Sequence, residues 1–252
     1  MSTKYFLLTK DSIVDNQHDQ VVSPNREMTF VLPTVNLPYY HEHGLFENRL
    51  IEWCKQFCHP DGMMLDIGAH TGTYSICLAE LCERVFAFEP QRLTFYALCG
   101  GVALSNRKNI HCFQLGLGSP AQVGMTSLKI RSHDGGGSSI CDIDPDAILD
   151  QEPIMVHTLD AVMEVAQSLE PSPLPPIRFI KMDVEYNELN VLRGAKSTLT
   201  KNGFPLILFE ANEGDTVGEL FAYLEKELPY RVVAVNGYGN MYLATPITPS
   251  RI

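Results

Sequence analysis

Two apolar runs of this sequence each end in a polar signature, and a helical pattern follows each of them. The first run, 63–67, opens into the turn Gly68-Ala-His-Thr-Gly72, and the second, 84–88, ends at Glu89. A strand that leads through a glycine turn into a helix, with an acid about twenty residues further on, is typical of a nucleoside-cofactor site. The glycines let the backbone approach the ligand, and the acid accepts the ribose hydroxyls.

The carboxylate of Asp66 stands at the mouth of the first turn, in the spacing D-x-G-x-x-x-G. A dinucleotide site has the spacing G-x-G-x-x-G instead, because its pyrophosphate must approach a helix N-terminus closely. An acid at this place would repel phosphate and could hold an ammonium or a sulfonium group. The spacing therefore favours a cationic ligand over NAD.

Strand-like and helical patterns alternate along most of the chain. Strands are predicted at 63–67, 84–89, 109–115, 177–182 and 205–210, with helices at 45–58, 73–82, 91–104, 187–201 and 216–227. Such alternation implies an α/β fold, in which helices cover both faces of a mostly parallel sheet. Two further strands, 230–235 and 241–245, form a hairpin that adds an antiparallel edge strand.

Two stretches have weaker patterns. Residues 1–44 are predicted to form a hairpin or lid extension, in front of a domain that spans 45–252. Residues 116–176 are predicted to be irregular, apart from one strand candidate at 126–130. In this stretch the tract Gly135-Gly-Gly-Ser-Ser139 indicates either a mobile loop near the site or an ordinary connection.

Composition narrows the class of partner. With a formal net charge of −11 and no visible basic patch, the chain is not expected to bind nucleic acid. The apolar runs are strand-sized, which predicts no membrane span, and the N-terminal run is too short for a signal peptide. The seven cysteines form no C-x-x-C pair, so a reducing, cytoplasmic compartment is expected. Metal binding by Cys54, Cys58 and His59 is disfavoured, because structural zinc needs four ligands at set spacings.

Four carboxylates fall at the ends of predicted strands, namely Asp66, Glu89, Asp183 and Glu210. Ligands of parallel α/β sheets bind at the carboxyl ends of the strands. We therefore expect these four side chains to lie in one site.

Three motifs occur in order along the chain. They are Leu-Asp66-Ile-Gly-Ala-His-Thr-Gly-Thr-Tyr-Ser75, Ala-Phe-Glu89-Pro and Phe-Ile-Lys181-Met-Asp183-Val-Glu185. This ordered set resembles the FkbM family of S-adenosylmethionine-dependent methyltransferases, and the resemblance covers roughly residues 45–212. Tyr186 departs from the family, which usually has glycine there, and His70-Thr71 replace a commoner pair. Because Tyr186 lies beside the methyl-transfer position, the resemblance does not carry the identity of the substrate.

The resemblance implies a Rossmann-like class I methyltransferase with a seven-stranded sheet and S-adenosylmethionine as its cofactor. Asp66 would engage the methionine end, directly or through water, and Glu89 would take both ribose hydroxyls. Leu117, at the end of the third strand, is expected beside the adenine. The other residues expected at the cofactor are Gly68, His70, Thr71, Gly72, Tyr74, Ser75, Pro90 and Asp183.

Asp183 and Glu185 follow the strand where the resemblance places the reacting methyl group. Alternate residues of an extended segment face the same way, so both carboxylates can point to one side. One of them could act as general base on a substrate hydroxyl, or both could orient it. With Glu210 they could instead bind Mg²⁺, because three converging carboxylates repel one another without a cation. Lys181 could relieve this repulsion by reaching around the strand.

Two further features are candidates for the site. His157 is one, although a lone histidine is more often structural than catalytic. The cluster Tyr39-Tyr40-His41-Glu42-His43 is the other, as part of a lid or a substrate wall.

The sequence thus predicts a cytoplasmic methyltransferase that acts on a hydroxyl of a small molecule, a sugar or a glycan. One alternative is N-methylation of a protein or nucleic acid, which the acidic charge disfavours. The other is an inactive cofactor-binding or interaction module, which the intact motif residues disfavour. The acceptor, the metal requirement and the oligomeric state are left open by the sequence.

Overall fold

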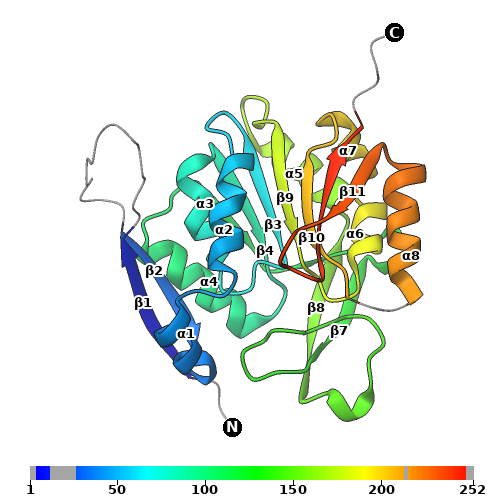
Figure 1. Cartoon of the computed structure of the whole chain (residues 1–252). Coiled ribbons are helices and arrows are strands. Elements are labelled where there is room, and N and C mark those ends of the chain that lie inside the picture. Colours follow the sequence, from blue (N-terminus) through cyan, green and yellow to red (C-terminus); the bar gives the residue numbers. More distant parts are fainter. Residues whose placement is uncertain (1–3, 12–26, 213–214, 248–252) are drawn as a thin grey trace.

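The computed structural model describes residues 4–11, 27–212 and 215–247. Its centre is a seven-stranded sheet with the strand order β11-β12-β10-β9-β3-β4-β5 (Figure 1). The strands are β3 (Met63–Ile67), β4 (Arg84–Phe88), β5 (Ile110–Phe113), β9 (Ile177–Met182), β10 (Leu206–Glu210), β11 (Tyr230–Ala234) and β12 (Met241–Pro246). The five strands from β10 to β5 pair in parallel, which confirms the predicted α/β sheet.

The hairpin of β11 and β12 forms one edge of the sheet. β12 pairs antiparallel with both β10 and β11, so the antiparallel strand lies inside the edge and β11 is outermost. Met241 pairs with Glu210, and this register brings the turn between β11 and β12 to the carboxyl end of β10.

Helices cover both faces of the sheet, as the alternating pattern predicts (Figure 1). Successive residues of β3 face opposite ways, since Met64 packs in one apolar core and Leu65 in the other. The first core lies under α2 (Asn48–Cys54), α3 (Thr73–Leu78) and α4 (Arg92–Leu104). The second lies under α5 (Leu159–Leu169), α6 (Glu188–Arg193), α7 (Lys196–Lys201) and α8 (Asp215–Ala222).

The N-terminal segment packs into the first core. β1 (Tyr5–Asp11) and β2 (Glu27–Pro33) pair as the predicted hairpin, and α1 (Leu37–His43) follows them. Phe30 and Leu32 are fully buried, and Tyr40 is 4% exposed. These three side chains belong to the same cluster as Met64 of the central strand. The segment is therefore continuous with the main core.

The region 116–176, predicted to be irregular, holds a second sheet and a helix. β6 (Gly116–Leu117), β8 (Asp150–His157) and β7 (Gly124–Ile130) form this three-stranded sheet. Thr158 caps the N-terminus of α5, because its Oγ accepts the N–H of Ala161 at 3.2 Å. Leu159, Val162 and Ala166 follow at helical spacing and pack in the second core. The irregular assignment was thus wrong for α5, although its periodicity was present in the sequence.

The helix predicted over 187–201 consists of two short helices, α6 and α7, that separate at Gly194. A Cβ atom on Gly194 would lie 2.1 Å from the carbonyl oxygen of Gly118, so the backbones meet closely at this point. The carboxylate of Asp160 accepts two backbone N–H groups in the first turn of α7 and caps it. Within the described ranges, no helix has the length and apolar character needed to cross a lipid bilayer.

Candidate active site

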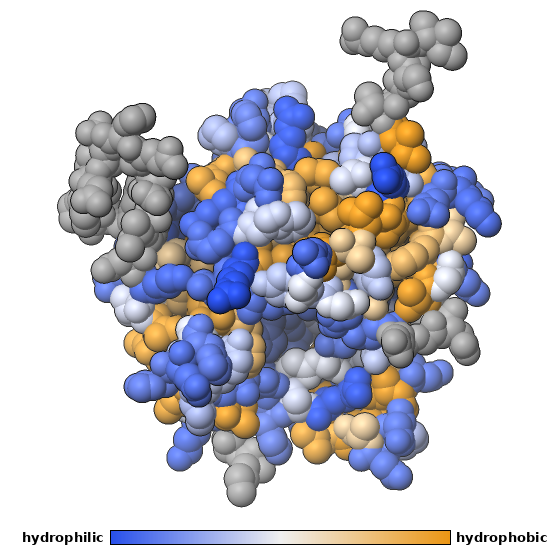
Figure 2. Space-filling view, viewed as in Figure 1, coloured by the Kyte–Doolittle hydropathy of each residue, from blue (hydrophilic) through white to orange (hydrophobic). Residues whose placement is uncertain are grey.

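A cavity of about 390 Å³ opens at the carboxyl ends of β3, β4, β9 and β10. A hollow is visible near the centre of the face shown in Figure 2. Three of the four carboxylates predicted at strand ends line the cavity, namely Glu89, Asp183 and Glu210. The strand-end rule, which places ligands at the carboxyl ends of parallel strands, therefore correctly groups three residues that lie far apart in the sequence.

The turn after β3 depends on Gly68, whose φ of 79° lies in the left-handed region. A Cβ atom at this position would lie 1.8 Å from the carbonyl oxygen of Asp183, so glycine is required for the ends of β3 and β9 to meet. His70 continues the turn and donates its N–H to Oε2 of Glu89 at 2.8 Å. This contact ties the turn to the end of β4.

Glu89 is 7% exposed and accepts two backbone N–H groups. His70 donates to Oε2 and Gln91 to Oε1, each at 2.8 Å. Burial raises the pKa of Glu89 to about 7, although the two hydrogen bonds act in the opposite direction. The carboxylate is thus fixed at the cavity wall beside Pro90, an orientation suited to ribose hydroxyls. Its contact with ribose stays a prediction.

Asp66 lies behind the turn. It is 1% exposed, and its Oδ2 accepts the N–H of Ser75 at 3.0 Å and the Ser75 hydroxyl at 2.6 Å. Because Ser75 is in the first turn of α3, this carboxylate caps the helix. Among the residues predicted to contact the cofactor, Asp66, Thr71, Gly72 and Ser75 do not line the cavity. Asp66 shapes the turn from behind, and direct contact with a ligand is not supported.

Lys181 is 5% exposed and lines the cavity together with Tyr74. Its ammonium lies 3.2 Å from Oδ2 of Asp183, 3.3 Å from the carbonyl oxygen of Gly68 and 5.2 Å from the centre of the Tyr74 ring. Burial alone would lower the pKa of Lys181, but the charges of nearby carboxylates, Asp183 foremost, raise it above its usual value. The lysine is therefore charged and offsets part of the negative charge around it.

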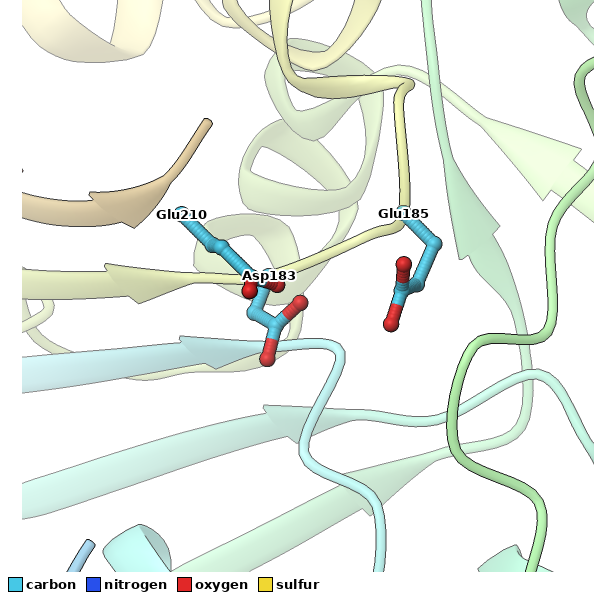
Figure 3. Close-up of side chains that lie close together, drawn as sticks. All are labelled: Asp183, Glu185 and Glu210. Carbon is cyan, nitrogen blue, oxygen red and sulfur yellow. The ribbon is translucent and has the colours of Figure 1, made fainter. Parts of the chain in front are cut away.

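Asp183, Glu185 and Glu210 form a carboxylate cluster in which one oxygen of each lies within 4.8 Å of the others. Figure 3 shows Asp183 at the end of β9, Glu210 reaching it from β10, and Glu185 on the turn that follows β9. On its other side Glu210 accepts the side-chain N–H of Asn240, which lies in the turn between β11 and β12.

Glu210 and Asp183 are arranged to share a proton. Burial and the charge of Asp183 raise the pKa of Glu210 to about 8. Burial also acts to raise the pKa of Asp183, but the charge of Lys181 and a hydrogen bond from Glu210 bring it below the usual value. Oδ1 of Asp183 is buried and has no hydrogen-bond partner among the described residues. At neutral pH we therefore expect an ionised Asp183 that accepts from a protonated Glu210.

The backbone after Asp183 passes through two left-handed residues, Glu185 (φ 53°) and Tyr186 (φ 76°). This conformation is uncommon for an aromatic residue and is readily adopted by glycine, the residue that the resemblance leads one to expect at position 186. Tyr186 does not line the main cavity, because it lies in a small separate groove beside Ala211 and Asn212. Burial, together with the charge of Asp183, raises the pKa of Glu185.

Among the cavity-lining residues that the sequence analysis missed are Phe46, Glu47, Asp134 and Asn187. Glu47 accepts the hydroxyl of Tyr74 at 2.9 Å. Asn187 donates to the carbonyl oxygen of Leu117 at 3.1 Å and so fixes the strand end that was expected beside adenine. Two of them had a local signal, because Asn187 lies two residues beyond the third motif and Asp134 directly precedes the glycine tract.

The two further candidates lie apart from the cavity wall. His157 ends β8 and does not line the cavity. The cluster Tyr39–His43 forms part of α1, and none of its residues lines the cavity directly. Tyr39 instead stacks on Phe46, with 4.1 Å between the ring centres, and so supports a residue that does.

A family model described as the methyltransferase FkbM domain matches residues 66–232, which is more than half of the chain. The chain belongs to the FkbM methyltransferase family. All three motifs lie in the matched segment, whereas β1, β2, α1 and α2 precede it. This FkbM-family protein is therefore an S-adenosylmethionine-dependent methyltransferase with a Rossmann-like fold.

Solved structures with a similar fold have low sequence identity to the FkbM-family protein. The precorrin-6y C5,15-methyltransferase of Geobacter metallireducens is 14% identical, with 81% of this chain and 90% of that chain covered and a TM-score of 0.48. An rRNA methylase from Streptococcus thermophilus is 13% identical, with 78% and 92% covered and a TM-score of 0.44. A SAM-dependent methyltransferase from Aquifex aeolicus is 16% identical, with 84% and 93% covered and a TM-score of 0.42. A search of curated protein sequences found no match.

The cavity of the FkbM-family protein fits S-adenosylmethionine in charge and shape. Among the described residues, six acids and one lysine line it, so a cation is favoured there. The cofactor carries a sulfonium and an ammonium. Gly68 lines the cavity with its backbone, and Glu89 stands one strand away with a fixed carboxylate. These residues are the ones that would hold the methionine and ribose parts.

Proposed function

We propose that this methyltransferase acts on a hydroxyl group of an uncharged small molecule, sugar or glycan. The observation that carries the proposal is the carboxylate cluster of Asp183, Glu185 and Glu210 on the cavity wall. An ionised carboxylate only accepts hydrogen bonds, so it pairs with a hydroxyl donor and repels a phosphate or another anion.

An aromatic side chain that lines the cavity supports the same class of acceptor. Phe46 lines the cavity, is 38% exposed and is backed by Tyr39. An exposed aromatic face packs well against the C–H groups of a sugar or of another ring. Carboxylates and an exposed aromatic face in one cavity therefore suit a ring that carries hydroxyl groups.

The cofactor, when bound, supplies a methyl group already activated on a sulfonium, so the residues mainly position and accept a proton. Asp183 is the ionised member of the cluster and would accept the proton of the attacking hydroxyl. Lys181 holds the Asp183 carboxylate through its ion pair. Glu210, protonated near neutral pH, reduces the repulsion within the cluster.

Mg²⁺ is the alternative means of neutralising the cluster. The three carboxylates offer the oxygen ligands that this ion prefers. A bound ion would take the place of the proton on Glu210. We favour the proton, because the pKa of Glu210 is already raised to about 8, and a proton on this carboxyl would supply a donor near the unpartnered Oδ1 of Asp183.

The test is a labelled-methyl transfer assay against pooled neutral sugars and glycans, amines, and phosphorylated sugars. We expect label in the neutral hydroxyl pool and none in the phosphorylated pool. Asp183→Asn should lower the rate by about a hundredfold or more, the usual contribution of a positioned base. Asp146→Asn, at an exposed acid outside the cavity, is the matched control and should leave the rate unchanged.

Label that appears in the amine pool would contradict the hydroxyl assignment. Full activity of Asp183→Asn would contradict the role given to that carboxylate.

A further inference from the structure

The loop between β7 and β8 forms one wall of the cavity. Asp134, the segment 135–138 and Ile140 line the cavity from this loop (Figure 1). Three of these residues are consecutive glycines, so the loop has many backbone conformations available when nothing holds it. Contacts with other parts of the chain are therefore needed to hold the loop against the cavity.

Several contacts hold the loop, and three of them are anchors from different parts of the chain. Ser139 donates its hydroxyl to the carbonyl oxygen of Glu185 at 2.6 Å. The ring Nε2 of His70 lies 2.8 Å from the carbonyl oxygen of Asp134. Asn36, just before α1, donates its side-chain N–H to Oδ2 of Asp134 at 2.5 Å. Among the three anchors, only Asn36 lies outside the segment 66–232 that the family model matches.

The two carboxylate oxygens of Asp134 accept hydrogen bonds from different parts of the chain. Oδ1 accepts the hydroxyl of Ser132 and the N–H of Gly136, which shapes the loop internally. Oδ2 accepts from Asn36, which ties the loop to the N-terminal segment. Burial acts to raise the pKa of Asp134, but these hydrogen bonds bring it below its usual value, so the acceptor is charged. A hydrogen bond to a charged group is among the stronger ones.

We propose that Asn36 is a positioning residue of the cofactor site, and that its bond to Asp134 holds the loop 132–139 closed over the cavity. The inference rests on the assignment of this cavity to the cofactor. A cofactor that enters or leaves must then pass a loop fastened by a residue outside the family domain. Loss of the bond should speed release of the ligand. The Asn36 side chain makes no capping bond in α1 but also hydrogen-bonds the buried Tyr40, so the melting temperature of each variant separates an effect on the core from an effect on the loop.

The experiment compares Asn36→Ala, Asn36→Asp and the double variant Asn36→Asp/Asp134→Asn with the wild-type chain. Dissociation of S-adenosylhomocysteine is measured by surface plasmon resonance, and hydrogen exchange of amides 133–138 is measured without ligand. Asn36→Ala should raise the dissociation rate roughly tenfold, the loss typical of a hydrogen bond to a charged group. Asn36→Asp should loosen the loop further, because the new carboxylate would repel the carboxylate of Asp134.

The double variant exchanges donor and acceptor and leaves Oδ1 of residue 134 free for Ser132 and Gly136. It should return both the dissociation rate and the amide exchange to within about twofold of wild type. Asn236→Ala is the matched control at an exposed asparagine of the hairpin turn, outside the cavity, and should change neither quantity. The melting temperature of every variant is recorded.

Wild-type exchange and dissociation in Asn36→Ala would overturn the inference, as would a double variant as loose as Asn36→Asp. Failure of the wild-type chain to bind S-adenosylhomocysteine would instead refute the cofactor-site assignment. The exchange measurement would then still decide whether Asn36 fastens the loop.

Discussion

Two glutamates of the site hold a proton near neutral pH for different reasons. Glu89 does so because burial outweighs its two backbone hydrogen bonds, and its pKa rises to about 7. Glu210 does so because the charge of Asp183 adds to burial, and its pKa rises to about 8. Protonation of Glu89 competes with ribose binding, whereas protonation of Glu210 stabilises the ionised form of Asp183. Cofactor affinity and turnover should therefore depend on pH through separate groups.

Affinity for S-adenosylhomocysteine should increase from pH 6 to pH 8, because the ribose hydroxyls need an ionised Glu89 and its pKa is about 7. Below that pKa the gain approaches about tenfold per pH unit. Isothermal titration at several pH values measures it, and Glu89→Gln should bind weakly with a flatter profile. An equal slope in both proteins would assign the titration to another group.

The same raised pKa affects folding with a definite sign. Between the ordinary glutamate value of 4.5 and about 7, the folded chain binds the proton of Glu89 more tightly than the unfolded chain does. The contribution of this group to the free energy of unfolding is present below that window and is lost as the pH rises through it.

At the residue scale, the sequence analysis was correct where a general structural rule could be applied to a local sequence pattern. The strand-end rule placed Glu89, Asp183 and Glu210 in one cavity. It failed for Asp66, because the rule gives the end of a strand and not the direction of a side chain within it. Whether that carboxylate faces the ligand or caps α3 depends on Ser75, which lies nine residues later.

At the scale of elements, the approach of β3 and β9 is the contact that builds the site. Their carboxyl ends meet where Gly68 touches the carbonyl of Asp183, and no side chain fits between them. The pattern of alternating strands and helices predicts a mostly parallel sheet, but it gives neither the order of these strands nor the distance between them. Helix α5 was missed for a different reason. Its helical periodicity was present in the sequence, but it lay within a stretch that was predicted to be irregular.

Gly68→Ala should destabilise the protein by about 3 kcal/mol or more and abolish cofactor binding, because a Cβ would overlap Asp183 in addition to the backbone strain. Gly237→Ala is the matched control, with a φ of 84° and nothing within 4 Å of the added atom. This substitution should lower the free energy of unfolding by only about 1–2 kcal/mol, because it adds backbone strain without a steric overlap. Urea unfolding measures both, and equal losses would show that strain, not overlap, dominates at Gly68.

At the scale of the whole molecule, one apolar core joins the N-terminal hairpin to the central sheet. Phe30, Leu32 and Tyr40 pack with Met64, although they precede the matched family domain. The sequence predicts the hairpin but could not show this packing, because contacts between distant segments leave no periodic signal. The bond between Asn36 and Asp134 spans 98 positions and was hidden for the same reason.

Leu32→Ala should lower the free energy of global unfolding by about 3 kcal/mol, because Leu32 is fully buried in the shared core. Leu7→Ala, at a side chain of the same hairpin that is 61% exposed, should change it by less than about 0.5 kcal/mol. Urea unfolding followed by circular dichroism gives both values. A wild-type midpoint for Leu32→Ala would mean that the hairpin folds apart from the sheet.

The position of β12 has a consequence for synthesis of the chain. β11 is made before β12, yet β12 separates it from β10 in the finished sheet. While a ribosome is still adding residues 235–246, β11 has no partner in its final place and the edge of β10 stays open. The same turn brings Asn240 to Glu210. A nascent chain can thus pair β9 with β10 and bring Glu210 beside Asp183 early, but the hydrogen bond from Asn240 that holds Glu210 forms only after the turn into β12 has emerged.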